Sequence, residues 1–399
     1  MTIDPRMLIN PNVIRDPYPF YDELRTTAPV WRAGDANIFV VTGFDLLAEA
    51  ARRVEDFSSE IHAFLYRDDD GCPRTLPLEV GPPTLAVADP PLHTLHKQLI
   101  FPQFVSKRMS AIEDDIRAHT AACLDRIEAM DAFDFMVEIG GAVPIHAISR
   151  LLGFQENNDR ALLQAAYDAS EMTGGTMTLA EFHDKHRQSD EVRGWLEAQL
   201  ARRDGLRNED ILDAIKIATM SGKISHGQAL IVMLTLLSAG AESTASLLGN
   251  AVRILAERPA LVAMLKANMH LLPSFIEEAG RLESPFRHHL RSVPRDSALG
   301  GVAIPAGSTM LLMWGAANRD PTKFENPGTL SLERRPQHVT FGRGIHLCVG
   351  AALARMEARI VLTAMLARER FPIVSADIAP EWEYNLMVRR HKVLPMRWH

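Results

Sequence analysis

The sequence predicts a mostly α-helical protein with a minor, segregated β part, which is an α+β arrangement. Helical periodicity dominates from Leu92 to about Leu271 and is broken only by short polar segments. Strand-like runs appear instead toward the two ends of the chain, and they do not alternate with helices. Strands kept apart from helices in this way are typical of α+β folds and not of parallel α/β folds.

The elements can be assigned in order along the chain. Residues 29–33 and 37–43 form strand-like runs around the turn-forming GDAN, and residues 44–54 have an amphipathic helical period. The Gly- and Pro-rich stretch that ends in TLAVADPP predicts a long loop before the helical part. Beyond that part come the strand-like VAIPAG and STMLLMW, a Pro-rich stretch, a helix from about Val349 to Arg368 and a tail of mixed strand character.

The longest apolar run extends from Ala229 to Ala241, and Glu242 follows it at once. It is shorter than the roughly 20 residues that a membrane span needs. We therefore expect a buried core helix, with Ser225 as its N-cap. Because no Gly/Ser linker or internal repeat interrupts the chain, we expect a single domain over residues 1–399.

Composition excludes several classes of protein. The 399 residues are 47% hydrophobic, which suits a globular core, and the net charge of -7 argues against nucleic-acid binding. The three cysteines are Cys72, Cys123 and Cys348, and they form no CxxC pair. We therefore expect a protein of the reducing cytoplasm, without disulfides. The N-terminal residues show no signal peptide or membrane anchor, and no GxGxxG or GK[ST] loop indicates a nucleotide site.

The segment FGRGIHLCVG, residues 341–350, places a cysteine directly before a predicted helix. A helix N-terminus lowers the pKa of a thiol, and thiolate is the form that binds metals. Gly342, Gly344 and Gly350 allow a tight loop close to something flat and large. A buried apolar cysteine or a nucleophile remains an alternative. Zinc is a poor fit, since His346 and Cys348 lack two further ligands at usable spacing.

This segment resembles the haem-binding loop of the cytochrome P450 family, and the following ALARMEARI resembles that family's proximal helix. The pattern F-G-x-G-x-H-x-C-x-G is carried by Phe341, Gly342, Gly344, His346, Cys348 and Gly350. The resemblance implies the P450 fold, with a long central helix over haem b and Cys348 as the axial thiolate of the iron. It also implies haem contacts from Phe341 and Gly350. Such a thiolate favours O–O cleavage.

The stretch AGAEST, Ala239 to Thr244, resembles the oxygen-site segment of the family's central helix. The resemblance implies that Ala239 and Gly240 lie close to the porphyrin, and that Glu242 and Ser243 are the acid–alcohol pair that relays protons. Serine stands where threonine is usual, so the hydroxyl is kept but its χ1 angle is less restricted. The alternative is an incidental polar stripe on a core helix.

Two further sets of residues follow from the resemblance. Glu278 and Arg281, three apart in EAGR, together with Arg334, resemble the family's buried Glu–Arg network, whose role is structural. Carboxylates of the haem propionates need cationic or donor partners, and the candidates are His93, Lys97, Arg291 and His346. Lys97 replaces the usual arginine and loses its bidentate fork. A surface histidine at a helix start is the alternative for His93.

The resemblance implies a soluble, cytoplasmic monooxygenase that inserts one oxygen atom of O₂ into a small organic substrate. A separate ferredoxin and ferredoxin reductase would supply electrons, because the sequence contains no flavin or iron–sulfur region. A peroxide-driven haem-thiolate enzyme is an alternative, against which Glu242 argues. A haem-bearing binding or sensor protein without turnover is another.

By family position, the substrate pocket should be lined by four segments of the chain. These are the loop around His62, Phe64 and Tyr66, the central helix near Leu236 and Ala239, the SPFRHHL segment and the NLMV segment near the C-terminus. Arg287, His288 and His289 are unusually polar for this position. We expect them to face solvent, with contact to a substrate acid or phenol as the alternative.

Overall fold

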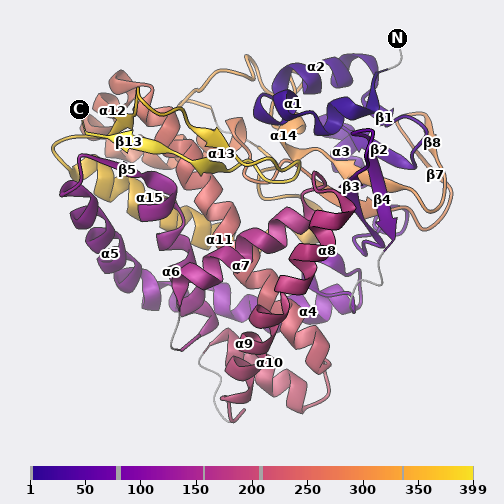
Figure 1. Cartoon of the computed structure of the whole chain (residues 1–399), viewed down its shortest axis with the longest axis horizontal. Helices are drawn as coiled ribbons and strands as arrows, with labels where there is room; N and C mark the ends of the chain where they lie inside the picture. Colours follow the sequence, from indigo (N-terminus) through magenta and orange to yellow (C-terminus); the bar gives the residue numbers. More distant parts are fainter. Residues whose placement is uncertain (1–2, 78–81, 156–157, 206–209, 335–336, 399) are drawn as a thin grey trace.

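The computed structural model describes residues 3–77, 82–155, 158–205, 210–334 and 337–398. It consists of helices packed around one long central helix, with small separate sheets at the edge (Figure 1). The predicted α+β arrangement is therefore correct. The helices of the main body are α4 (Leu92–Ile100), α5 (Ser106–Glu128), α6 (Ala142–Leu152), α7 (Asp159–Thr173), α8 (Leu179–Gln188), α9 (Asp190–Ala201), α10 (Ile211–Met220), α11 (His226–Ala256), α12 (Pro259–Ala267), α13 (Leu272–Leu282) and α15 (Ala351–Ala367).

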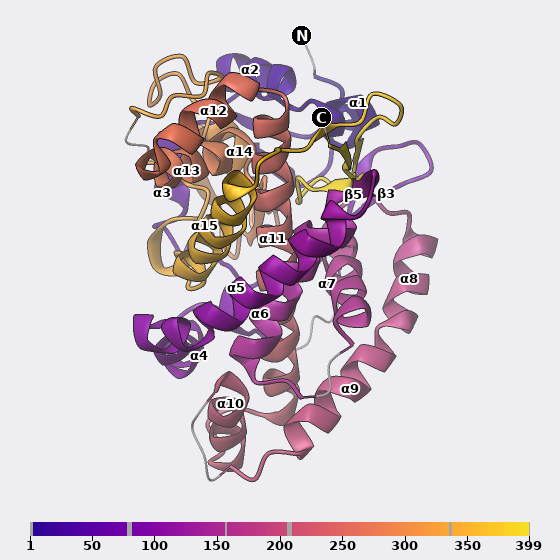
Figure 2. The same ribbon diagram turned by 90° about the vertical axis from the view of Figure 1, so that its left-hand side faces the viewer.

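The central helix is α11, which Figure 2 shows passing behind α5 and α6 through the middle of the molecule. It is 31 residues long and begins with a capping box between Ser225 and Gln228. By length and composition α11 could cross a membrane, but 61% of its most apolar window is buried inside the fold. It packs against α6, α7, α13 and α15, as expected for a core helix.

The largest sheet joins two N-terminal strands to two strands from residues 289–312. Its order is β1 (Val30–Arg32), β2 (Ile38–Val41), β9 (Thr309–Leu312) and β6 (His289–Ser292), with β2 and β9 parallel and the other pairs antiparallel. All residues of β2 and β9 are buried, because apolar clusters cover both faces. The short helices α1 (Pro11–Arg15), α2 (Tyr18–Thr27), α3 (Phe44–Ala50) and α14 (Trp314–Ala317) pack around this sheet.

The remaining strands form small two- and three-stranded units. β5 (Ala132–Asp134), β13 (Pro395–Arg397) and β10 (Ile373–Val374) form one sheet, and the pairs are β7 (Ser297–Leu299) with β8 (Val302–Ile304) and β11 (Glu381–Trp382) with β12 (His391–Val393). β3 (Ala63–Arg67) and β4 (Pro73–Pro77) form a hairpin within the stretch expected to be a loop. Asp68 stabilises its turn by accepting the N–H of Cys72 at 2.7 Å. The sequence predicted a loop here because glycine and proline residues are typical of loops.

Candidate active site

A mainly apolar cavity lies between α11, α4, β6 and the loop that precedes α15. Apolar side chains such as Leu236, Leu247 and Phe286 form much of its wall. The cavity is also lined by nearly all of the site residues that the sequence predicts, which are His93, Lys97, Ala239, Gly240, Ser243, Arg291, Phe341, His346, Cys348 and Gly350. Segments far apart in the chain therefore meet at one place.

The loop before α15 is held by backbone contacts that require its glycines. The N–H of Cys348 donates to the carbonyl of Phe341 at 2.9 Å, which closes the loop. Gly344 has a φ of +76°, and a Cβ there would lie 2.9 Å from the carbonyl oxygen of Ala51. Any side chain at this position would combine backbone strain with a steric clash against the end of α3.

The sulfur of Cys348 lies at the N-terminus of α15, where the N–H groups of Gly350 and Ala351 donate to it. Burial nevertheless raises the pKa of the Cys348 thiol, and these N–H groups and the charge of Arg355 only partly oppose it. The expected lowering of the pKa is therefore wrong for the protein atoms alone, because desolvation outweighs the helix terminus. A metal cation at the sulfur would reverse this balance.

The oxygen-site segment places Ser243 and Thr244 on the cavity wall. The Ser243 hydroxyl donates to the carbonyl of Ala239 at 2.6 Å, so its lone pairs are left to accept from the cavity. A Cβ on Gly240 would lie 2.8 Å from Cγ1 of Ile148 in α6. The small residue at this position is thus needed for helix packing beside the cavity.

Glu242 does not line the cavity in the described part of the chain, although Ser243 beside it does. It is 1% exposed, and its Oε1 lies 2.8 Å from Nε of Arg390, in the C-terminal segment. Arg390 also pairs with Glu383 at 2.9 Å and stacks 3.7 Å from the centroid of the Tyr167 ring. Burial raises the pKa of Glu242 to about 7, and Arg390 opposes the rise. Nothing in the sequence connected Arg390 to α11.

Basic residues gather at one edge of the cavity. The rings of His93 and His346 are 4.3 Å apart between centroids, and Nε2 of His346 lies 2.9 Å from the hydroxyl of Ser59. Lys97 donates to the carbonyl of Ile345 at 2.7 Å, and Arg291 donates to that of Leu290 at 2.7 Å.

The charges at this edge are not balanced by protein carboxylates. Neither Lys97 nor Arg291 forms an ion pair within the described residues, and Arg291 is only 6% exposed. The nearby carboxylate of Asp89 is occupied by the Ser58 hydroxyl at 2.6 Å and by the N–H of Ser59 at 3.0 Å. Arg291 is buried and Lys97 is half-buried, and neither has an acid partner, so negative charges on a ligand at this edge would compensate both. The two propionates of a haem fit this requirement.

The comparisons with known proteins agree with this geometry. The model of the family described as Cytochrome P450 matches residues 176–389. Cytochrome P450 144 of Mycobacterium tuberculosis is 36% identical over 94% of this chain and 88% of that protein. The chain belongs to the cytochrome P450 family. It is therefore an oxidoreductase of the monooxygenase type, and its cofactor is haem b.

Other P450s are similar over nearly the whole length. The cytochrome P450 monooxygenase PikC of Streptomyces venezuelae is 32% identical over 96% of this chain and 91% of that protein. The crystal structure of CYP109E1 from Bacillus megaterium, in complex with testosterone, superimposes with a TM-score of 0.86 at 26% identity. It covers 97% of this P450 and 98% of that chain.

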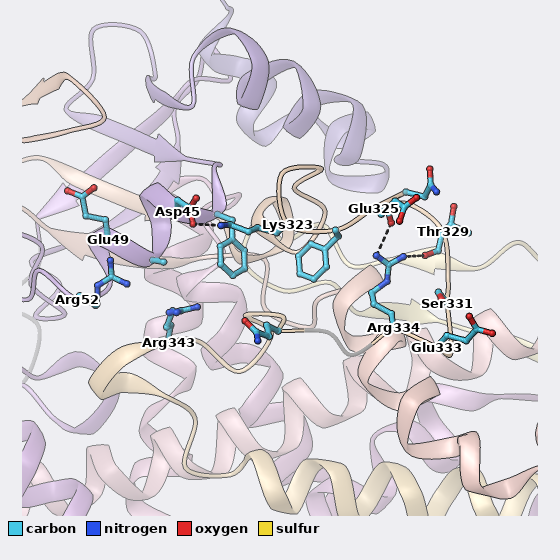
Figure 3. A pocket seen from close by; sticks show the side chains of 15 residues that line it. Asp45, Glu49, Arg52, Lys323, Glu325, Thr329, Ser331, Glu333, Arg334 and Arg343 are labelled. Carbon is cyan, nitrogen blue, oxygen red and sulfur yellow. Dashed lines mark hydrogen bonds and ion pairs between the residues drawn. The ribbon is translucent and has the colours of Figure 1, made fainter.

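The Glu–Arg network predicted from the sequence is present in the structure. Glu278 and Arg281 are both 0% exposed and pair at 2.7 Å, and Arg334 approaches Glu278 to 3.4 Å. Figure 3 shows Arg334 beneath the loop whose carbonyls, those of Glu325 and Thr329, accept its hydrogen bonds. The network thus fastens the polar, Pro-rich stretch to α13.

The expectation that Arg287, His288 and His289 face solvent is wrong. Arg287 and His288 are buried, with exposures of 2% and 0%. The guanidinium of Arg287 donates to the carbonyls of Ile14, Asn385 and Val388, so it connects the N-terminal helices to the C-terminal segment. Three carbonyl acceptors compensate for its burial without an acid.

The predicted substrate-pocket segments are only partly correct. Pro285, Phe286 and His289 line the cavity, but His62, Phe64, Tyr66 and the NLMV residues are not among the described lining residues. Phe64 packs instead against Phe182 of α8, 6.0 Å between ring centroids. Strand β3 of the β3–β4 hairpin packs beside α7 and α8.

Proposed function

We propose that this P450 holds haem b through the thiolate of Cys348 and inserts one oxygen atom of O₂ into a small organic substrate. One observation carries the proposal: Cys348 at the start of α15 and Ser243 of α11 line the same cavity. When bound, the haem supplies the binding and cleavage of O₂. Cys348 would hold the iron through its sulfur, and Ser243 would present a hydroxyl to the same cavity.

The other site residues position the cofactor and move protons. Lys97 and Arg291 hold the propionates by charge, and His93 and His346 add hydrogen bonds. Ala239 and Gly240 bring the α11 backbone to the cavity wall. Ser243 would relay a proton by turning its own hydroxyl proton from the Ala239 carbonyl into the cavity while its oxygen accepts another, and Glu242 provides a proton reserve behind the helix.

The substrate is a mainly apolar molecule. Leu85, Leu236, Leu247 and Phe286 surround the part of the cavity near α11, and they exclude water from the reacting atoms. Thr235 and Thr244 are the hydroxyl groups on α11 besides Ser243 that line this space. They provide orientation, whereas burial of apolar surface provides most of the affinity.

We further propose that electrons come from a ferredoxin and its reductase in the cytoplasm. Arg52 and Arg343 are exposed beside the Cys348 loop and form no ion pair within the described residues (Figure 3). Arg343 lines the haem cavity and also a surface groove between α3 and the segment that begins at Lys323, so an acidic partner bound in this groove would lie close to the cofactor.

The test starts with the metal bond. Cys348→Ala should abolish the red-shifted Soret band of the reduced CO complex, and Cys72→Ala in the β3–β4 hairpin should retain it. A band that persists in Cys348→Ala would show that another residue holds the iron. A spectral screen then identifies ligands that bind near the iron. With such a ligand and a surrogate ferredoxin and reductase, the consumption of NAD(P)H and the formation of product are measured. These two rates distinguish a monooxygenase from a peroxide-driven enzyme and from a sensor.

A further inference from the structure

His289 is a cavity residue that the haem-site pattern does not include. It begins β6, where side chains alternate between the two faces of the sheet. His289 and Arg291 therefore point to the same face, and both line the cavity, whereas Leu290 between them packs into the apolar cluster on the other side. A histidine thus stands next to a cation that has no carboxylate partner.

Trp314 fixes the protonation state of this histidine. The indole Nε1–H of Trp314 donates to Nδ1 of His289 at 2.7 Å. Indole nitrogen only donates, so Nδ1 must carry the lone pair and the ring proton must be on Nε2. Burial and the charge of Arg291 lower the pKa of His289 to about 4, in agreement with a neutral ring. His289 is consequently a neutral donor with one free N–H.

The partner of His289 is rigidly placed. Trp314 is 2% exposed and packs in the apolar cluster under the sheet. Trp314 lies two residues after the end of β9, and β9 pairs with β6 so that Leu312 lies opposite His289. The register of the two strands therefore brings the indole next to the imidazole. The Phe286 ring, 5.2 Å away between centroids, restricts the imidazole from another side.

We propose that His289, held by Trp314 with its proton on Nε2, is a further hydrogen-bond donor to a haem propionate, beside Arg291. The inference rests on the proposed haem site. His289 stands two residues from Arg291 on the same face of β6 and lines the same cavity as His346, which places it at the basic edge of the cavity. A carboxylate is the acceptor that suits this edge, and its source is the haem or an acidic substrate.

Two substitutions separate the two ends of the imidazole. In His289→Asn the side-chain amide lies at the position of Nδ1, so it can still accept from Trp314 but no donor reaches the Nε2 position. In His289→Gln the amide lies at the position of Nε2 and can still donate to the carboxylate. Each variant therefore keeps one of the two hydrogen bonds of the imidazole: His289→Asn keeps the bond from Trp314, and His289→Gln keeps the bond to the carboxylate.

The measurement is the rate of haem transfer from the substrate-free ferric protein to excess apomyoglobin. A hydrogen bond to a charged acceptor corresponds to about a tenfold change, so His289→Asn should lose haem about ten times faster than the parent. His289→Gln and the surface control His183→Phe should stay close to the parent. Absence of the thiolate Soret band in the parent would instead contradict the proposed function.

Two outcomes would overturn the inference. Equal haem-transfer rates in the parent, His289→Asn and His289→Gln would show that His289 does not contact the propionate. If the rates are equal but His289→Asn weakens the spectral binding of fatty-acid ligands, the carboxylate belongs to the substrate. Trp314→Phe gives an independent check, because loss of the indole donor frees the tautomer and should also accelerate haem transfer.

Discussion

Glu242 and Arg390 form a buried ion pair, 2.8 Å from Oε1 to Nε, behind the helix that carries the oxygen-site segment. Arg390 in turn pairs with Glu383, whose side chain is 14% exposed. The three charged groups therefore extend from the buried face of α11 toward the surface. The two residues of the predicted acid–alcohol pair therefore lie in different places: Ser243 lines the cavity, and Glu242 is buried on another face of α11.

The position of Glu242 predicts a pH dependence. Burial raises its pKa to about 7, so the carboxyl is protonated below this pH and ionised above it. If Glu242 supplies protons, turnover should fall as the pH rises through about 7. Glu242→Gln should lower turnover by about 100-fold or more and remove this dependence.

The measurement is the steady-state rate of product formation with a fixed substrate and saturating redox partners. The rate is followed from about pH 6 to about pH 9, a range of roughly three units that includes the pKa of Glu242. Glu383→Gln is the matched control, because it removes the outer acid and leaves Glu242 paired with Arg390. Identical pH profiles in the parent and in Glu242→Gln would remove Glu242 from the proton pathway.

The Glu278–Arg281 pair should be essential for the folded state. Both side chains are 0% exposed, so Glu278→Ala leaves a buried guanidinium without its acid, at a cost of about 3–5 kcal/mol. We expect aggregated or haem-free protein. Glu277→Ala is the comparison on the same helix: it removes the acid partner of Arg355, which is 41% exposed and can be solvated, and of His338, which need not carry a charge, so its cost should be smaller.

Expression yield, haem content and the Tm of each variant provide the comparison. A normal Tm and full haem content in Glu278→Ala would mean that water or a neighbouring group replaces the carboxylate. For Glu277→Ala we expect full haem content and a smaller fall in Tm than for Glu278→Ala.

Sequence patterns predicted the parts of the fold that depend on local chemistry. The capping box at Ser225 and the apolar run after it located α11, and the glycines around Cys348 located the loop. The β3–β4 hairpin was missed because Pro73 and Pro77 conceal the alternation of a strand. Arg287 was misplaced because its carbonyl acceptors come from residues far along the chain.

The same distinction applies to the site. Cys348, His346 and Ser243 belong to continuous motifs, so a single stretch of sequence identified them. Arg390 and Trp314 act on α11 and β6 from distant segments, and only the folded chain brings them there. Non-local partners of charged and aromatic residues are the part of a site that sequence motifs do not predict.

The exposed Arg343 should contribute to binding of the electron donor. Reversal of its charge in Arg343→Glu should weaken binding of an acidic ferredoxin about tenfold at low ionic strength, and the difference should shrink as salt screens the charges. Arg193→Glu on α9, which lies away from α3 in both views (Figures 1 and 2), is the control. The readout is the dependence of the haem reduction rate on ferredoxin concentration.

A salt-independent effect of Arg343→Glu would indicate damage to the loop around Cys348, since Arg343 also lies 5.8 Å above the Phe44 ring. Arg52→Glu tests the same surface from the turn that follows α3. If neither variant changes the reduction rate at any salt concentration, the donor binds elsewhere.

The last prediction concerns Ser243, whose hydroxyl is bonded to the Ala239 carbonyl at 2.6 Å and faces the cavity. Ser243→Ala should leave substrate binding nearly unchanged, because the apolar wall is intact. Fewer electrons should reach product and more should appear as hydrogen peroxide, because proton delivery at the oxygen site loses its hydroxyl. Ser243→Thr keeps that hydroxyl and adds the methyl that restricts χ1, so it should match or improve coupling.

Product and peroxide are measured per NAD(P)H consumed. Thr244→Val is the control, since Thr244 lines the same wall one residue further round the helix. If Ser243→Ala couples as well as the parent while Thr244→Val does not, the proton relay runs through Thr244.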